Sequence, residues 1–358
     1  MSKARTIVSK DLLSPESIES TTNRELKLMM ICCEENAPYG PASDTARMFL
    51  QLLGMAYERF CSLTNGRDSK QTKLSSVTIA IYHAQDEDYP SSEHEWNSYD
   101  GVIIPGSLSC AYDTHTPWIR RLHTVIREEI HENRRKTLAV CFGHQSFAHA
   151  FGEGSNEIGR RNGEAIKCPT GKKAGRKPFN FTSVGECLLA YPLTTGVDTN
   201  SKAARTSLEM LYTHGDMVGT LPTVGLSLGG NGEVPIQSAA YFASQDCALK
   251  FNQYADSLQH GSSSTSTSHL PLTGFLNRDD QESLPYAMTF QAHPEYVSVD
   301  GFKVHFLNVL KTMEKLHHID SATSKQASED ATRNFDRVLT DSLDVMVSVG
   351  VILGWFQD

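Results

Sequence analysis

The 358-residue sequence predicts an α/β protein built on a doubly wound, mostly parallel sheet. Apolar, strand-like runs alternate with segments that carry apolar residues at helical spacing. The first run, residues 26–33, is almost continuously apolar, as expected for a strand buried on both faces of a parallel sheet. Glycine-bearing loops follow later runs, at the edge where ligands bind in open α/β sheets.

The alternation continues through the first half of the chain. Thr116 suits a helix N-cap and Pro117 suits the first helical position, so a helix is predicted to begin there. The elements expected after the first strand are a helix at 43–61, strands at 77–82 and 101–104, a helix from 116 to about 133 and a strand at 137–140.

The second half is less regular, and its shorter runs predict peripheral strands of a mixed sheet. These strands are expected at 182–189, 209–212, 224–228 and 239–243, followed by a buried strand at 288–292 and helices at 304–316 and 335–356.

The expected organisation is one large domain with additions at both ends. Residues 1–24 lack periodicity and predict a mobile arm, residues 25–316 the domain, 317–334 a polar linker, and 335–358 a helix that packs back on the body. Two insertions interrupt the domain: a basic run near 167–177, expected to be a solvated loop, and a low-complexity Ser/Thr-rich segment near 259–270.

Composition excludes several classes of protein. A formal charge of −9 and a pI near 5.9 disfavour a nucleic-acid-binding surface. Eight cysteines without a C-x-x-C pair predict free thiols in a reducing compartment. We expect no secretory signal, no membrane span and a cytoplasmic location. No zinc-like ligand spacing and no Walker loop is present, so the sequence predicts neither a metal, nor a cofactor, nor the use of ATP.

Cys141 stands where the strand at 137–140 turns sharply into a helix through Gly143. This pattern resembles the nucleophile elbow of G-x-S-x-G hydrolases, in which the nucleophile faces the start of a helix. A helix N-terminus favours a thiolate and supplies N–H groups to an oxyanion. The alternative is an inert core cysteine, the common fate of a cysteine after a buried strand.

His293, Pro294 and Glu295 form the second candidate element. A residue before proline is pushed into an extended backbone, in which the side chains at positions i and i+2 point the same way. Glu295 is therefore expected to fix the tautomer of His293, which gives the base and orienting group of a triad with Cys141. Taken alone, the tripeptide would more often be a surface turn.

These segments together resemble class I (triad-type) glutamine amidotransferases, in the order and at the approximate separations of that family across residues 26–312. The pattern of the first loop, the elbow and the His-Pro-Glu-Tyr ending looks closest to stand-alone GMP-synthetase-like amidotransferase domains and plant γ-glutamyl peptidases. Two residues depart from the family pattern: Ala139 replaces a glycine, and Ala292 replaces a bulkier residue or glycine beside the histidine. The matching segments are 105–107, 141–145, 214–216 with 221–222, and 290–296.

The resemblance implies a flavodoxin-like fold and a role for each site residue. Cys141, His293 and Glu295 would be the catalytic residues. The backbone N–H groups of Gly106 and Phe142 would form the oxyanion hole, where one donor is worth a few kcal/mol of barrier. Ser107 and Gln145 are expected to bind the glutamyl group. His144 is expected to be structural. His214 and Asp216 are expected near the mouth of the site.

The predicted function is cysteine-dependent hydrolysis of a γ-glutamyl amide bond, in glutamine or a γ-glutamyl peptide, through a γ-glutamyl thioester. The partner is then a small γ-glutamyl substrate, with neither nucleic acid nor membrane. Two alternatives stay open: a glutaminase subunit that supplies ammonia to a separate synthetase, and a non-catalytic relative that binds or regulates. The two insertions and the C-terminal helix are expected to wall off the pocket, which favours a stand-alone hydrolase.

Overall fold

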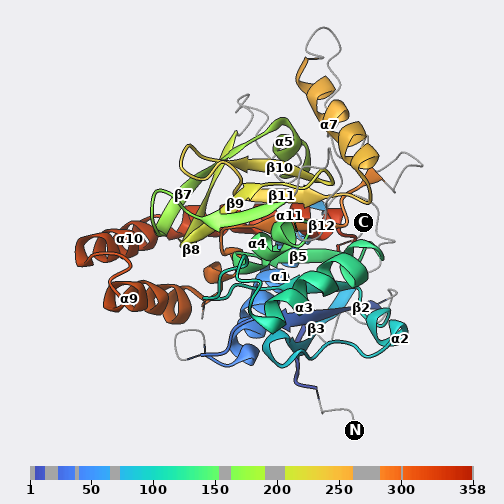
Figure 1. The fold of residues 1–358 in the computed structure, drawn as a ribbon, viewed down its shortest axis with the longest axis horizontal. Coiled ribbons are helices and arrows are strands. Elements are labelled where there is room, and N and C mark those ends of the chain that lie inside the picture. The colour runs from blue at the N-terminus through green and yellow to red at the C-terminus, as the bar shows by residue number, and fades with distance from the viewer. Residues whose placement is uncertain are drawn as a thin grey trace.

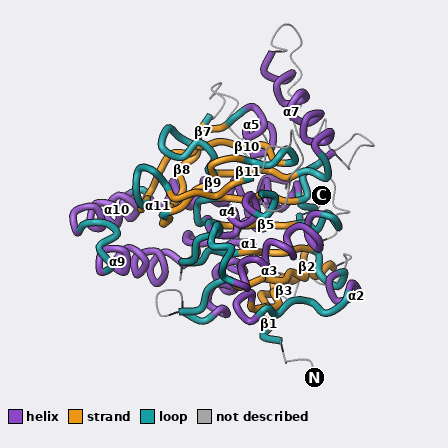
Figure 2. Tube along the Cα trace, viewed as in Figure 1, coloured by secondary structure: helices purple, strands orange, loops and turns teal. Residues whose placement is uncertain are grey.

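The computed structural model describes residues 5–12, 23–36, 40–64, 73–152, 163–189, 206–260, 283–299 and 301–356. These residues form a large sheet flanked by helices on both faces (Figure 1 and Figure 2). The strands are β1 (Ile7–Asp11), β2 (Asn23–Cys32), β3 (Lys73–His83), β4 (Gly101–Ile104), β5 (Thr137–Val140), β6 (Glu164–Lys167), β7 (Lys173–Phe181), β8 (Ser207–His214), β9 (Asp216–Thr220), β10 (Gly225–Gly230), β11 (Ser238–Tyr241) and β12 (Ala287–Phe290).

The main sheet has the strand order β1-β3-β2-β4-β5-β12-β11-β10-β7-β8, and β6 pairs with β9 in a small second sheet. The five strands β3, β2, β4, β5 and β12 are parallel. Their order is that of flavodoxin-like folds. Antiparallel strands extend this core on both sides, β1 at one edge and β11, β10, β7 and β8 at the other. The predicted doubly wound α/β architecture with peripheral mixed strands is therefore confirmed.

The helices form a layer on each face of the sheet. Their α-helical bounds are α1 (Ala42–Thr64), α2 (Glu93–Trp96), α3 (Pro117–Val125), α4 (Phe142–His149), α5 (Ser183–Leu189), α7 (Gln245–His260), α9 (Leu307–Lys315), α10 (Ser321–Arg333) and α11 (Phe335–Ile352). Shorter 3-10 and π segments are η2 (Ala84–Asp86), η3 (Ile126–His131), η5 (Pro294–Val297) and η6 (Gly301–Phe306). Among the described residues, no helix combines the length and the apolar character that a membrane span needs.

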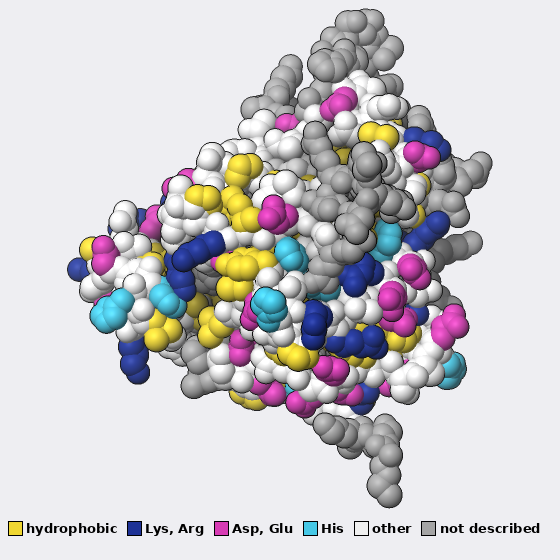
Figure 3. Space-filling view, viewed as in Figure 1, with side chains coloured by type: hydrophobic (Ala, Val, Ile, Leu, Met, Phe, Trp, Pro, Cys, Tyr) yellow, Lys and Arg dark blue, Asp and Glu magenta, His cyan; other side chains and the backbone are white. Residues whose placement is uncertain are grey.

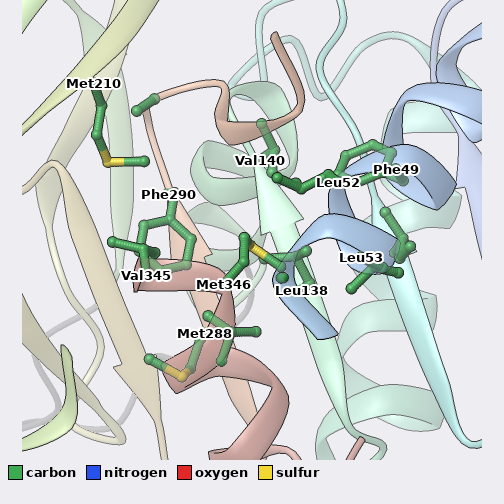
Figure 4. Close-up of a cluster of buried hydrophobic side chains, with 14 of the residues drawn as sticks. Phe49, Leu52, Leu53, Leu138, Val140, Met210, Met288, Phe290, Val345 and Met346 are labelled. Atoms are coloured by element: carbon green, nitrogen blue, oxygen red, sulfur yellow. The ribbon is translucent and has the colours of Figure 1, made fainter. Parts of the chain in front are cut away.

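Two hydrophobic cores lie on opposite faces of the sheet because alternate strand residues point to opposite sides. In β2, Leu28 and Met30 join the core beneath α1 and α11, whereas Met29 and Ile31 join the core beneath α3 and α4. Figure 4 shows the first core, in which side chains of α1 and α11 meet those of the central strands. The labelled residues are Phe49, Leu52, Leu53, Leu138, Val140, Met210, Met288, Phe290, Val345 and Met346.

Both ends of the chain differ from expectation. The predicted mobile arm contains β1, which pairs in antiparallel fashion with β3, and Arg5 stacks its guanidinium 3.4 Å from the ring centroid of Tyr82. The predicted linker at 317–334 consists mostly of helix α10, capped by Asp320, whose side chain accepts a hydrogen bond from the Thr323 N–H. The helix was not predicted because the segment is mostly polar and only small residues, among them Ala327 and Ala331, are buried.

Two internal predictions are also wrong. The strand expected at 182–189 is absent, and Ser183–Leu189 form helix α5 instead. The helix backbone packs close to the sheet, since a Cβ on Gly185 would lie 1.8 Å from the Leu228 carbonyl oxygen. Much of the basic run at 167–177 is strand β7, paired with β8, rather than a solvated loop. Of the Ser/Thr-rich segment near 259–270, the first two residues end α7, and residues 261–270 lie outside the described residues.

Candidate active site

The candidate catalytic residues lie together because they follow neighbouring parallel strands. β4, β5 and β12 are adjacent and parallel, so their carboxyl ends meet at one edge of the sheet. Gly106 follows β4, Cys141 follows β5 and His293 follows β12. This is the edge at which open α/β sheets bind ligands.

Cys141 occupies a strained turn between β5 and α4. Its backbone has φ 52° and ψ −107°, a conformation that residues with a Cβ rarely adopt. The Cys141 N–H donates to the Phe290 carbonyl oxygen at 2.7 Å, which ties the turn to β12. Gly143 permits the tight packing that follows, since a Cβ there would lie 2.2 Å from the Ile104 carbonyl oxygen. The thiol is 4% exposed and stands at the start of a helix, where N–H groups lack helical partners.

His293 and Glu295 form a buried pair beside this turn. Nδ1 of His293 lies 2.7 Å from Oε1 of Glu295, and the two side chains are 1% and 3% exposed. At His293 the backbone has φ −108° and ψ 82°, outside the helical region, as expected for a residue before proline. The extended backbone does not continue to Glu295, however, because Pro294 begins the 3-10 helix η5 and Glu295 lies within it. The tight turn still brings the carboxylate to the imidazole. The ring of Tyr296 stacks on that of His293, with centroids 4.3 Å apart and planes 8° apart.

The charges around His293 favour its protonated form. Burial opposes a charge on the imidazole, but the Glu295 carboxylate and the Cys141 sulfur outweigh burial and raise the pKa of His293 above its usual value. Nδ1 is held by Glu295, while Nε2 is buried without a hydrogen-bond partner among the described residues. Nε2 is thus the nitrogen through which a proton could move.

Gly106 lies against both the cysteine and the histidine. A Cβ at this position would lie 3.1 Å from Cε1 of His293, 3.5 Å from Cβ of Cys141 and 3.9 Å from its sulfur. Phe142 is the first residue of α4, so its N–H has no carbonyl partner within the helix. The two backbone segments predicted to form the oxyanion hole therefore both adjoin Cys141.

Ser107 is held by a residue that the sequence did not point to. Glu34 follows β2, and its Oε2 atom accepts hydrogen bonds from the Ser107 hydroxyl and the Leu108 N–H, each at 3.0 Å. The Glu34 carboxylate thus fixes the loop that carries Gly106. Its only sequence signal is its position just after the first strand, at the edge where ligands bind.

A pocket of about 630 Å³ opens beside Cys141, within the range of about 300–1,000 Å³ typical of small-molecule sites. Ser107 and Gln145 both line it, and Gln145 is fixed by donating its amide hydrogens to the Asp216 carbonyl oxygen at 2.8 Å and to Oε1 of Gln291 at 3.1 Å. The other lining residues are Leu108, Ser109, Cys110, Tyr112, Lys167, Cys168, Gly171, Lys172, Thr213, His214, Gly215, Asp216, Val309, Met313, His317 and His318.

His214 and Asp216 lie in the wall of this pocket. Nδ1 of His214 donates to the Asp216 carbonyl oxygen at 2.8 Å, and the Asp216 carboxylate accepts a hydrogen bond from the Tyr112 hydroxyl at 3.0 Å. Burial lowers the pKa of His214 to about 4 and keeps it neutral at pH 7. Tyr112, like Glu34, was not among the predicted site residues. The sequence did indicate it indirectly, because Tyr112 and Asp113 end the loop whose pattern resembles the family.

His144 lies three residues after Cys141, in α4, and points into the core. It is fully buried, with Nδ1 2.7 Å from Oγ1 of Thr289, and burial lowers its pKa to about 3. Ala292 is also buried in the core and does not line the pocket. Across the described parts of the chain, no cluster of three His, Cys, Asp or Glu side chains is arranged to bind a metal.

No protein-family model matches the chain. It is 28% identical over 115 residues to a Saccharomyces cerevisiae protein assigned by name to the glutamine amidotransferases, covering 31% of this chain and 42% of the relative. It is 34% identical over 71 residues to γ-glutamyl peptidase 4 of Arabidopsis thaliana, covering 20% and 27% of the two chains. The matches thus span less than half of either relative.

The fold extends the similarity over nearly the whole chain. A glutamine amidotransferase from Thermotoga maritima superposes with a TM-score of 0.50 at 12% identity, covering 92% of this chain and 98% of that one. The resemblance predicted from the motifs is therefore confirmed: parts of the chain are similar in sequence to a protein named as a glutamine amidotransferase and to a γ-glutamyl peptidase, and the chain has the glutamine amidotransferase fold.

Proposed function

We propose that this protein hydrolyses γ-glutamyl amide bonds, with Cys141 as nucleophile, His293 as acid and base, and Glu295 as the group that orients the base. The observation that carries the proposal is the buried His293–Glu295 pair beside a cysteine held in a strained turn. An inert core cysteine would require neither the strain nor a buried charged pair. Such features cost free energy and concentrate at functional sites.

The proposed reaction proceeds in two steps. The Cys141 thiolate attacks the γ-carbonyl carbon, the C–N bond breaks, and His293 gives its proton to the departing amine. His293 then removes a proton from water, which attacks the thioester and releases glutamate with regeneration of the thiol. The net reaction converts one γ-glutamyl amide and one water into glutamate and an amine.

The surrounding groups take supporting roles in this proposal. The N–H groups of Gly106 and Phe142 would stabilise the tetrahedral oxyanion, and removal of one such donor typically costs about 2.7–4 kcal/mol of transition-state stabilisation. Ser107 and Gln145 would contact the glutamyl group. Protein groups and water supply every proton and electron pair that the reaction needs.

The test is release of glutamate by the purified protein from glutamine and from γ-glutamyl peptides, without added ATP or metal. We expect activity in the wild type and in Cys110→Ser, which removes another thiol of the same pocket, and none in Cys141→Ser. Retention of full activity by Cys141→Ser would refute the assignment of the nucleophile.

The same assay separates the stand-alone hydrolase from a partner-dependent glutaminase. A protein inactive alone that gains glutaminase activity when mixed with cell extract would be a subunit that supplies ammonia to a synthetase. A protein inactive under both conditions, yet still able to bind γ-glutamyl compounds, would be a binding or regulatory relative.

A further inference from the structure

The pocket beside Cys141 continues to an outer wall that carries positive charge. This wall comes from the end of β6, from the turn between β6 and β7, and from the residues just after α9, which lies beside α10 at the left of Figure 1. We call its four side chains the cationic rim: Lys167, Lys172, His317 and His318, all of them exposed. Asp216 is the one carboxylate among the described lining residues.

The two lysines of the rim form no ion pair with a described carboxylate. Neither Lys167 nor Lys172 forms an ion pair within 4 Å in the described part of the chain. The next residue shows the contrast: Lys173 points away from the pocket and lies 3.1 Å from the Glu233 carboxylate. The pocket lining holds these two lysines and one carboxylate, that of Asp216, whose charge acts on Lys172 from beyond ion-pair distance. The lining therefore carries a net positive charge.

A contact between Lys172 and His318 holds two side chains of the rim together. Nζ of Lys172 lies 2.7 Å from Nδ1 of His318, so the ammonium donates to a neutral imidazole and joins the β6–β7 turn to the end of α9. An ammonium has three hydrogens, and this contact uses one of them. No second hydrogen bond of this ammonium is present among the described residues, so its other two hydrogens can bind a ligand at the pocket mouth.

Apolar side chains adjoin the rim. Leu108, on the loop after β4, is 56% exposed, and Val309 and Met313 of α9 also line the pocket. An exposed leucine and two further apolar side chains beside unpaired lysines make a surface that suits a ligand with an apolar group and a carboxylate. Ammonia, the leaving group from glutamine, could contact neither part.

We propose that the cationic rim and this apolar wall form the subsite for the leaving amine, so that the preferred substrate is a γ-glutamyl peptide with an apolar residue and a free carboxylate. The inference rests on the proposed hydrolysis of γ-glutamyl amides at Cys141. The γ-carbonyl would lie at Cys141, and the carboxylate of the leaving amino acid would bind Lys172. The same C–N bond breaks, and the amine leaves as a free amino acid.

The test compares γ-glutamyl-leucine with γ-glutamyl-leucinamide, which differ only in the terminal carboxylate. We expect the wild type to prefer the acid by about fivefold in kcat/KM, the factor that one partly exposed ion pair of about 1 kcal/mol supplies. Lys172→Met should remove most of this preference through a higher KM for the acid, with kcat and the activity on the amide nearly unchanged. Lys177→Met, in the same basic run but outside the pocket lining, is the matched control and should keep the preference.

The outcomes separate this inference from the proposed function. Equal cleavage of the two compounds by the wild type, or an unchanged preference in Lys172→Met, would overturn the subsite while leaving the hydrolase intact. Cleavage of neither compound, nor of glutamine, would refute the hydrolase itself. Equal loss of activity on acid and amide in Lys172→Met, with Lys172→Arg failing to restore the preference, would show a structural role and overturn the subsite as well.

Discussion

Nδ1 of His293 lies 2.7 Å from Oε1 of Glu295, and the residue between them begins a 3-10 helix. The pair is buried, and the stacked ring of Tyr296 covers one face of the imidazole. The carboxylate can therefore hold the imidazole in one orientation, with Nε2 directed away from the pair. This relationship gives His293 and Glu295 different roles, which substitutions can separate.

Replacement of His293 should cost more activity than replacement of Glu295. His293→Ala removes the acid and base, a group typically worth about 10²–10⁴-fold in rate. Glu295→Gln keeps an acceptor oxygen for Nδ1 and loses only the charge, so we expect a smaller fall in kcat with little change in KM. Steady-state kinetics on one γ-glutamyl substrate measure both. Equal losses, or a greater loss in Glu295→Gln, would contradict these roles.

Glu295→Gln should also shift the pH dependence of kcat/KM. Burial lowers the pKa of His293, but the charges of Glu295 and Cys141 raise it overall, so the imidazolium persists to higher pH than usual. Loss of the Glu295 charge removes one of the raising causes, and the pKa of His293 must then fall. The alkaline limb of the kcat/KM profile should move to lower pH. An unmoved limb, or one at higher pH, would show that another group controls it.

Gly106→Ala should lower activity more than stability. The new Cβ would lie 3.1 Å from Cε1 of His293, so the imidazole or the loop must move by a few tenths of an ångström. Misplacement of an oxyanion donor costs up to about 10²–10³-fold in kcat. Gly232→Ala is the control, because a Cβ there meets nothing within 4 Å. Thermal unfolding should be nearly unchanged in both variants; full activity in Gly106→Ala would argue against a role for this loop.

Arg176→Ala should destabilise the attachment of α10. The Arg176 guanidinium makes two hydrogen bonds to the Asp330 carboxylate, at 2.8 and 3.0 Å, and also pairs with Glu209 on β8. Hydrogen bonds to charged groups contribute about 1.5–3 kcal/mol each when buried, and less here because the arginine is partly exposed. We expect a loss of about 1–2 kcal/mol in the free energy of unfolding by chemical denaturation.

The control for this prediction is Lys325→Ala on the same helix. Lys325 is 77% exposed and lies 3.9 Å from Glu329, so its removal should change stability by less than about 0.5 kcal/mol. A similar loss in both variants would show that helix propensity, rather than the Arg176–Asp330 contact, determines the stability of α10.

The parallel half of the sheet was predictable because its signals are local. Each central strand is an apolar run, and the turn after β5 carries the glycine that the close approach to Ile104 requires. Helix α5 was not predictable in this way. Val184, Cys187 and Leu188 are buried, but a short apolar run fits a strand or a helix equally well, and only packing against β10 decides between them.

Long-range pairing explains the other errors. β7 carries lysines, yet Lys173 is buried with Glu233 as its partner, sixty residues away along the chain. In the site, Cys141 and His293 could be predicted because each lies in a short motif whose residue types indicate its chemistry. Glu34 lacks such a motif: its contact with Ser107 joins residues 73 positions apart, and only the order of the strands brings them together.

Trapping the γ-glutamyl enzyme tests the role of Cys141 most directly. The purified protein is mixed with a γ-glutamyl substrate, quenched in acid within the first turnovers, digested with protease and analysed by mass spectrometry. We expect an added γ-glutamyl group on the peptide that contains Cys141, and no such group in the digest of the Cys141→Ser protein treated in the same way. A γ-glutamyl group on a different residue, or turnover by Cys141→Ser at the wild-type rate, would contradict it.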